Sequence, residues 1–127
     1  MKIRMDRRSL RLRLRRSEVD QITRSGKVEE GLRFGPGSKN IFSYSLEMSG
    51  EDSIGAALLD KRIEVHIPKE QLQNWALSDD VGIEGRIAFA DGNELNLLIE
   101  KDFVCLTGRP NEDQADNFPH PDGDQKC

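Results

Sequence analysis

The chain alternates hydrophobic and polar residues in one early segment and then changes to a helical spacing. Leu10, Leu12 and Leu14 are separated by single polar residues, a period of two that predicts a strand with one buried face. Val19 and Ile22 follow three residues apart, which is typical of the inner face of a short helix. The segment therefore predicts a strand that leads directly into a helix.

The same pattern returns 53 residues later. Ile63, Val65 and Ile67 align with the three leucines, and Leu72 and Trp75 align with the two helical positions. The same shift also pairs Ile3 with Ala56, Met5 with Leu58, Val28 with Val81, Leu32 with Gly85, Phe34 with Ile87, Phe42 with Leu95, Tyr44 with Leu97 and Leu46 with Ile99. A constant offset that persists through a change of period indicates an internal repeat.

Each half predicts the order strand, strand, helix, strand, strand, with residues 1–50 as the first repeat and 54–103 as the second. Ser17 and Glu18 are candidates to begin the first helix, and Pro68 suits the first turn of the second. Turns are expected at 35–37 (Gly-Pro-Gly) and 91–93 (Asp-Gly-Asn). One half alone would expose strand edges, so we expect two ββαββ halves to interleave into a small pseudo-twofold, swapped-hairpin-type barrel. The predicted class is mainly β (α+β), with two short helices.

The predicted domain covers residues 1–106, and residues 107–127 form a polar segment rich in Pro, Asp and Gly. Phe118 is its only sizeable apolar residue, so the segment cannot build a core of its own. Two interpretations remain open. The segment is either a flexible tail or a strap that docks Phe118 and the turn at 119–121 onto the domain.

Residues 65–87 resemble the AbrB/MazE-type swapped-hairpin domain. The matching features are Ile67-Pro68-Lys69-Glu70, the helical Trp75, Leu77 and the Ser78-Asp79-Asp80-Val81 turn. In that family two copies exchange hairpins to form one barrel, and in MraZ-like proteins the copies lie in tandem on one chain. The whole chain, with its MKIR opening and SLRLRL strand, also resembles a family of small uncharacterised bacterial proteins.

The resemblance implies the fold of that family, but it gives little support to DNA binding. DNA-binding members carry arginines four residues before the motif proline and on the first helical turns. The corresponding positions are Glu64, Leu72 and Gln73 in the second half and Arg11, Val19 and Asp20 in the first. Only Arg11 is basic, so most of the family's DNA-reading surface is absent.

Charge is distributed unevenly along the chain. Residues 1–33 hold eleven Lys or Arg and five Asp or Glu, while residues 34–127 hold eight and eighteen. A chain of this kind can pair its own halves, bind an anionic partner through its basic part or associate with itself. Charged residues make up 33% of the chain and no apolar run approaches the roughly 20 residues that span a bilayer, so we expect no membrane partner.

The basic segment is the main candidate binding site. With the three leucines buried, Arg11, Arg13 and Arg15 should lie on the opposite side of the same strand, roughly 7 Å apart. That spacing suits successive phosphates of DNA or another polyanion, with Arg7 and Arg8 adding contacts from the preceding turn. Three alternatives remain open: the arginines pair with the chain's own acids, meet an acidic protein, or take part in self-association.

Other chemistry has less support. Cys105, His120 and Cys127 are zinc-ligand types, but their spacing matches no established zinc motif. No phosphate-binding loop or catalytic triad is present, so we expect a protein that is not an enzyme and needs no cofactor, with zinc as a minor alternative. Two cysteines and the lack of a secretory leader pattern favour the cytoplasm.

Overall fold

The structure is a computed structural model that describes residues 1–103 and 116–119 of the 127-residue chain. The elements are, in order, β1 (Lys2–Asp6), β2 (Ser9–Leu14), α1 (Arg16–Ser25), β3 (Lys27–Arg33), the 3-10 turn η1 (Ser38–Asn40), β4 (Ile41–Ser49), β5 (Gly55–Leu59), β6 (Arg62–Pro68), α2 (Lys69–Leu77), β7 (Gly82–Ala88) and β8 (Glu94–Lys101). The prediction of a mainly β domain with two short helices is confirmed.

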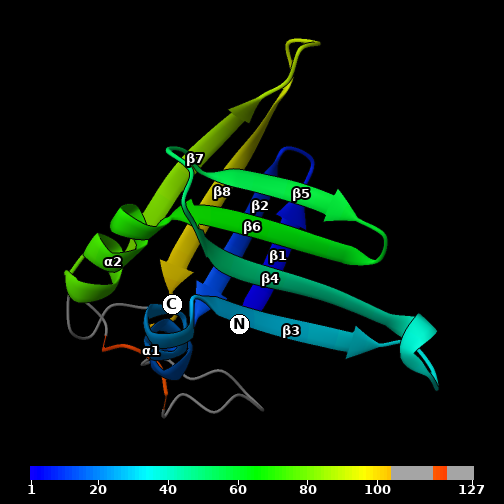
Figure 1. Ribbon diagram of the computed structural model, residues 1–127, viewed down its shortest axis with the longest axis horizontal. Helices are drawn as coiled ribbons and strands as arrows, with labels where there is room; N and C mark the ends of the chain where they lie inside the picture. Colours follow the sequence, from blue (N-terminus) through cyan, green and yellow to red (C-terminus); the bar gives the residue numbers. More distant parts are fainter. Residues whose placement is uncertain (104–115, 120–127) are drawn as a thin grey trace.

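The strands form two four-stranded sheets, with orders β1-β2-β8-β7 and β3-β4-β6-β5. Each sheet therefore combines one hairpin from residues 1–50 with one from residues 54–103. The two hairpins join through a parallel pair at the centre, β2 with β8 and β4 with β6. Figure 1 shows the strands of the two sheets crossing, with both helices gathered where the sheets meet.

The predicted barrel does not close. Within residues 1–103 and 116–119, the outer strands β1, β7, β3 and β5 pair only with their neighbours in the same sheet. Hydrophobic alternation shows which face of a strand is buried, but it does not show which edges pair. The core fills the space between the sheets around the helices, and towards the hairpin ends Met5 and Leu58 are largely exposed.

The core consists of the inward sides of both sheets and one side of each helix. The alternating residues predicted from the sequence are buried, including Leu12, Leu14, Val65 and Ile67. The two helices bury the following residues: Val19 and Ile22 from α1, and Leu72 and Trp75 from α2. Burying these apolar side chains removes them from water and is the main favourable contribution to the stability of the fold.

The predicted offset of 53 residues is wrong at β7. Val28 of β3 pairs with Leu46, whereas Ile99 of β8 pairs with Ile83, so β3 and β7 correspond at an offset of 55. Ile83 is 5% exposed and Val81 is 40% exposed, so the buried position is two residues later than predicted. The pairings of Leu32 with Gly85 and of Phe34 with Ile87 shift in the same way.

The two helices end differently, which explains this shift. Gly26 ends α1 in the left-handed conformation, with φ 84°, and its N–H donates to the Ile22 carbonyl before β3 begins at once. After α2 the chain makes a longer turn through Ser78 to Val81, and the Trp75 indole Nε1–H donates to the Val81 carbonyl at 3.1 Å. Pro68 lies at the N-cap of α2, one residue before the predicted first turn.

The two sheets interlock where the chain enters the second half. The side chain of Ile54 packs directly over Gly85 of β7, leaving no space there for a Cβ atom. On the other side of the molecule, the α-ammonium group of Met1 pairs with Glu18 and Glu30, and the Tyr44 hydroxyl donates to the Met1 carbonyl at 2.7 Å. One sheet therefore contacts the other through an apolar contact in one place and a polar contact in the other.

Residues 116–119 lie against the domain. The Phe118 N–H donates to the Asp102 carbonyl at 2.8 Å, and its ring meets that of Phe103 with centroids 5.8 Å apart. Asp116 accepts from the Arg16 N–H through its carbonyl at 3.0 Å. Among the described residues, no helix is both long enough and apolar enough to cross a membrane.

Candidate functional site

The outer side of the β1–β2 hairpin carries a cluster of exposed and half-buried cations. Antiparallel pairing places Lys2 opposite Arg13 and Arg4 opposite Arg11. All four lie on the side away from the core because Leu10, Leu12 and Leu14 point inward between them. We call these four residues, together with Arg7 and Arg8 of the connecting turn, the basic face.

Arg11 and Arg13 are not free cations. Both guanidinium groups donate from Nε to the same carboxylate oxygen, Oε1 of Glu100 on the adjacent strand β8, with Arg13 at 3.4 Å. This pairing agrees with the alternative interpretation in which the arginines form ion pairs with acidic residues in the second half of the same chain. Two guanidinium groups share one carboxylate, so the local charge remains positive.

The other predicted contacts occupy different environments. Arg7 and Arg8 are exposed in the turn, and the Arg7 N–H donates to Asp6 Oδ1 at 2.6 Å. Arg15 follows β2 as the N-cap of α1, where its backbone N–H donates to Glu18 Oε1 at 2.8 Å. The predicted straight row of three arginines is therefore only a pair, Arg11 and Arg13.

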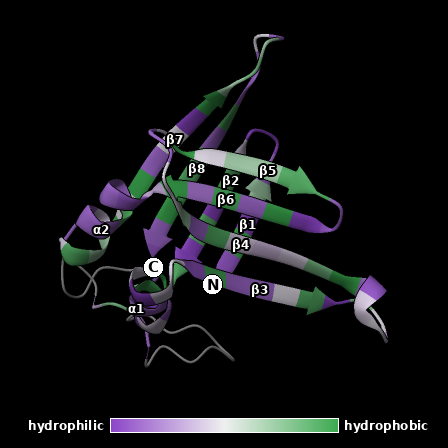
Figure 2. Cartoon of the chain, viewed as in Figure 1, coloured by the Kyte–Doolittle hydropathy of each residue, from purple (hydrophilic) through white to green (hydrophobic). Residues whose placement is uncertain are grey.

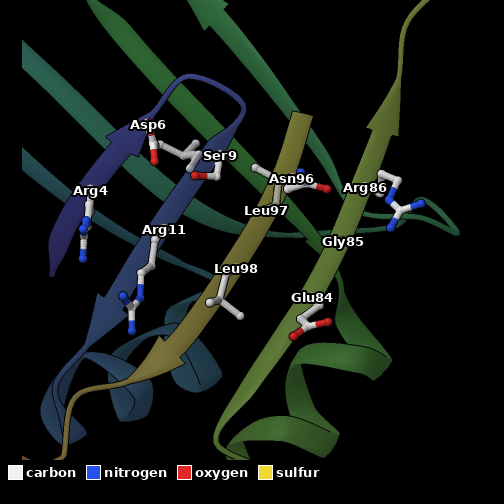
Figure 3. Close-up of a pocket in the computed structure, with 11 residues that line it drawn as sticks. Arg4, Asp6, Ser9, Arg11, Glu84, Gly85, Arg86, Asn96, Leu97 and Leu98 are labelled. Atoms are coloured by element: carbon white, nitrogen blue, oxygen red, sulfur yellow. The ribbon is translucent and has the colours of Figure 1, made fainter. Parts of the chain in front are cut away.

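A shallow groove of about 800 Å³ lies beside the basic face (Figure 3). Arg4 and Arg11 line one side, and Glu84 and Arg86 of β7 line the other. Its floor carries polar groups from Ser9 and Asn96 as well as the apolar Leu98 of β8. Arg86 pairs with Glu94 at 3.4 Å, and the exposed carboxylates of Asp6 and Glu84 also line the groove. The groove therefore contains charges of both signs, and the excess of positive charge lies on the basic face beside it.

Sequence reasoning did not single out Lys2, Arg86 and Glu100 as parts of this site. The alternation of β1, β7 and β8 contains the signal, because each of these residues lies next to inward-facing positions on its own strand. Lys2 lies beside Arg13 through the β1–β2 hairpin, but the position of Glu100 beside Arg11 and Arg13 depends on the β2–β8 pairing, which joins residues almost ninety positions apart in sequence. The alternation within one strand does not show which residues of another strand lie beside it.

The second sheet carries a different set of charges at the corresponding position. Glu47, Glu64 and His66 offer ligand atoms that all lie within 4.8 Å of one another. The Ser45 hydroxyl donates to Glu47 Oε2 at 3.0 Å, and Arg62 pairs with Glu64 Oε2. Two carboxylates and one imidazole are a donor set that a divalent cation can use. Glu47 precedes Glu100 by 53 residues, but the two glutamates have different neighbours. Glu47 lies near Glu64 and His66, whereas Glu100 accepts hydrogen bonds from Arg11 and Arg13.

The end of β8 buries a lysine beside aromatic rings. Lys101 Nζ donates to the Ser78 carbonyl at 2.6 Å and lies 5.7 Å from the Trp75 ring centroid and 5.5 Å from that of Phe118. Burial lowers the pKa of Lys101 below 10.5, and nearby Asp79 and Asp80 act in the opposite direction. These contacts connect β8, the turn after α2 and residues 116–119. The predicted zinc ligands Cys105, His120 and Cys127 lie outside the described residues.

Comparison with known proteins gives one result. The chain has no match among curated proteins and none among solved structures. Residues 1–122 match a family described as Family of unknown function (DUF7009), and the chain belongs to that family.

Proposed function

We propose that this protein is a non-catalytic binding protein that docks a polyanion, with the phosphate backbone of duplex DNA as the leading ligand, on its basic face. One observation carries the proposal. Arg4, Arg7 and Arg8 are exposed and form no ion pair within the described part of the chain. They lie beside two further arginines that share a single carboxylate, so this surface keeps a local excess of positive charge.

The chemistry of the surface favours phosphates over bases. Guanidinium groups bind phosphate oxygens through two parallel hydrogen bonds. Residues 1–16, which contain the basic face, include no aromatic side chain on which an unpaired base could stack, and such stacking is the usual feature of single-strand binding. Binding of this kind is mostly electrostatic and falls steeply as salt is added.

The proposed architecture limits binding to one side of the molecule. We propose that the two halves are copies of one unit that exchange hairpins. The proposal is supported by identical pairings 53 residues apart: Ile3 opposite Leu12 and Ala56 opposite Val65. Arg11 and Arg13 correspond to Glu64 and His66 in the second copy. Only the first copy presents a basic outer side, so we expect one polyanion site per chain.

The test is a fluorescence anisotropy titration of a mixed-sequence DNA duplex at about 50 mM and about 200 mM salt. The variant Arg4→Ala/Arg7→Ala/Arg8→Ala should bind at least about tenfold more weakly at the lower salt, because three exposed cations are removed. The slope of log K against log salt should also become shallower, by about 0.9 for each phosphate that the variant no longer neutralises.

The matched control is Arg24→Ala/Lys27→Ala/Arg33→Ala, which removes three exposed cations from α1 and β3. This variant has the same net charge as the basic-face variant and should bind nearly as the unchanged protein does. Equal weakening in the two triple variants would show that net charge, and not the basic face, governs binding. No binding by the unchanged protein at the lower salt would reject the polyanion proposal itself.

A further inference from the structure

The four outer strands differ in how they are protected against pairing with another chain. β1, β3 and β7 each include charged side chains, with the sequences KIRMD, KVEEGLR and GIEGRIA. β5 has the sequence GAALL and includes none. Charged residues on an outer strand discourage edge-to-edge association, and an apolar edge without them favours it. β5 is therefore the unprotected edge among the described strands.

The end of this strand is also exposed. Leu58 is 81% exposed and Leu59 is 44% exposed, although a strand of the same sheet lies on one side of them. Figure 2 shows β5 without hydrophilic colour along its length, in contrast to β1 and β3. Only β6 pairs with β5 in the described part of the chain, so the other edge offers unpaired backbone hydrogen-bonding groups.

The side-chain sizes along β5 are complementary to those of a second β5. If two copies pair antiparallel about Ala57, Leu58 lies opposite Ala56 of the other copy and Leu59 lies opposite Gly55. Each large side chain then faces a small one, so neither face is overfilled. A twofold arrangement makes both contacts twice, as expected for a self-complementary interface.

The flanking charges also fit this arrangement. Exposed Glu51 and Asp52 precede β5. At its other end exposed Asp60 is outweighed by exposed Lys61 and Lys39, which lie together because Lys61 Nζ donates to the Lys39 carbonyl at 2.5 Å. Antiparallel pairing brings the acidic end of one strand beside the basic end of the other. Parallel pairing would bring like charges together, so the charges favour one orientation.

We propose that the occupant of the β5 edge is the β5 edge of a second copy of this chain, which joins two four-stranded sheets into one continuous eight-stranded sheet. The contact involves two five-residue strands and so lies at the small end of protein interfaces. The dimer is accordingly weak and depends on concentration. It uses the second sheet, so it leaves the basic face on the first sheet accessible.

The test is sedimentation velocity over a concentration range from about 5 µM to about 500 µM, at a salt concentration of about 150 mM to limit non-specific charge effects. The weight-average mass of the unchanged chain should rise from 14.4 kDa towards twice that value. Leu58→Lys adds a charge to the unprotected edge and should keep the protein monomeric across the whole range.

The matched control is Met5→Lys. Met5 is 59% exposed, lies on the already charged edge strand β1 and precedes Leu58 by 53 residues, so the same substitution is made at the corresponding position. This control should dimerise as the unchanged chain does, and urea midpoints of both variants verify that they fold. An unchanged chain that stays monomeric at the highest concentration overturns the proposal. Equal behaviour of the two lysine variants does so as well.

Discussion

The contact between Ile54 and Gly85 gives the most direct test of how the two sheets fit together. A Cβ atom added at Gly85 would overlap Cγ2 of Ile54 and would lie 2.8 Å from its Cδ1, closer than carbon atoms approach in folded proteins. Cγ2 is attached directly to the branched Cβ of Ile54, so it cannot move aside by rotation of a distant bond. Gly85→Ala must therefore displace the whole Ile54 side chain or separate β7 from the start of β5.

The expected cost is that of overpacking a filled site, about 1–3 kcal/mol of unfolding free energy. Gly50→Ala is the control, since no atom of residues 1–103 or 116–119 lies within 4 Å of the added Cβ and Gly50 does not have a positive φ. This control should be neutral or slightly stabilising, because replacing glycine restricts the unfolded chain. Urea unfolding followed by the fluorescence of Trp75, the only tryptophan, measures both variants.

A second substitution separates the steric effect from other causes. Ile54→Ala alone should cost about 2 kcal/mol, the low end for such truncations because Ile54 is only partly buried. In the Ile54→Ala background, Gly85→Ala should cost little, because the new methyl group enters the space that the isoleucine vacated. The coupling energy should be about 1–2 kcal/mol. Strictly additive effects would refute direct packing of Ile54 on Gly85.

Three further predictions concern single residues. Desolvation, together with Glu30 and Glu18, raises the pKa of Tyr44 above 10.0. Absorbance of this sole tyrosine should therefore titrate above pH 10.0 and at lower pH in Glu30→Gln. Because the folded pKa is the higher one, this contribution to stability is complete below pH 10.0 and is lost as the pH rises through the folded pKa. Gly26→Ala should destabilise the protein by about 1 kcal/mol in urea unfolding, because it places a Cβ atom at φ 84°. Glu100→Gln removes the carboxylate shared by two arginines, so under the proposed function it should raise duplex affinity about threefold or more at low salt, and unchanged affinity would contradict that role.

Much of the fold could be predicted from the sequence because the hydrophobic pattern contains two different periods. The change from period two at Leu14 to a spacing of three at Val19 marks the border of β2 and α1, and the same change recurs at Ile67 and Leu72. The position of β7 could not be predicted in this way. Val81 and Ile83 are both apolar and lie two residues apart, so alternation fits either one. The hydrogen bond from Trp75 to the Val81 carbonyl fixes the choice.

The candidate site was predictable in part for a related reason. Alternation correctly placed Arg11 and Arg13 on the side of β2 opposite the leucines. It could not show that Glu100 lies beside both, since that contact depends on which strands become neighbours across a long stretch of chain. Alternation predicts Arg15 in the same row if the strand continues, whereas β2 ends at Leu14 and the helix begins at Arg16.

The parallel pairing of β2 with β8 has a consequence for synthesis of the chain. β2 ends at Leu14, but its central partner β8 begins only at Glu94, so β2 is synthesised long before β8. Until then the leucines of β2 have no β8 neighbour, and contacts between residues so distant in sequence form slowly. Nascent chains halted before β8 should accumulate as aggregation-prone, protease-sensitive species, and the first sheet should form only after β8 has left the ribosome.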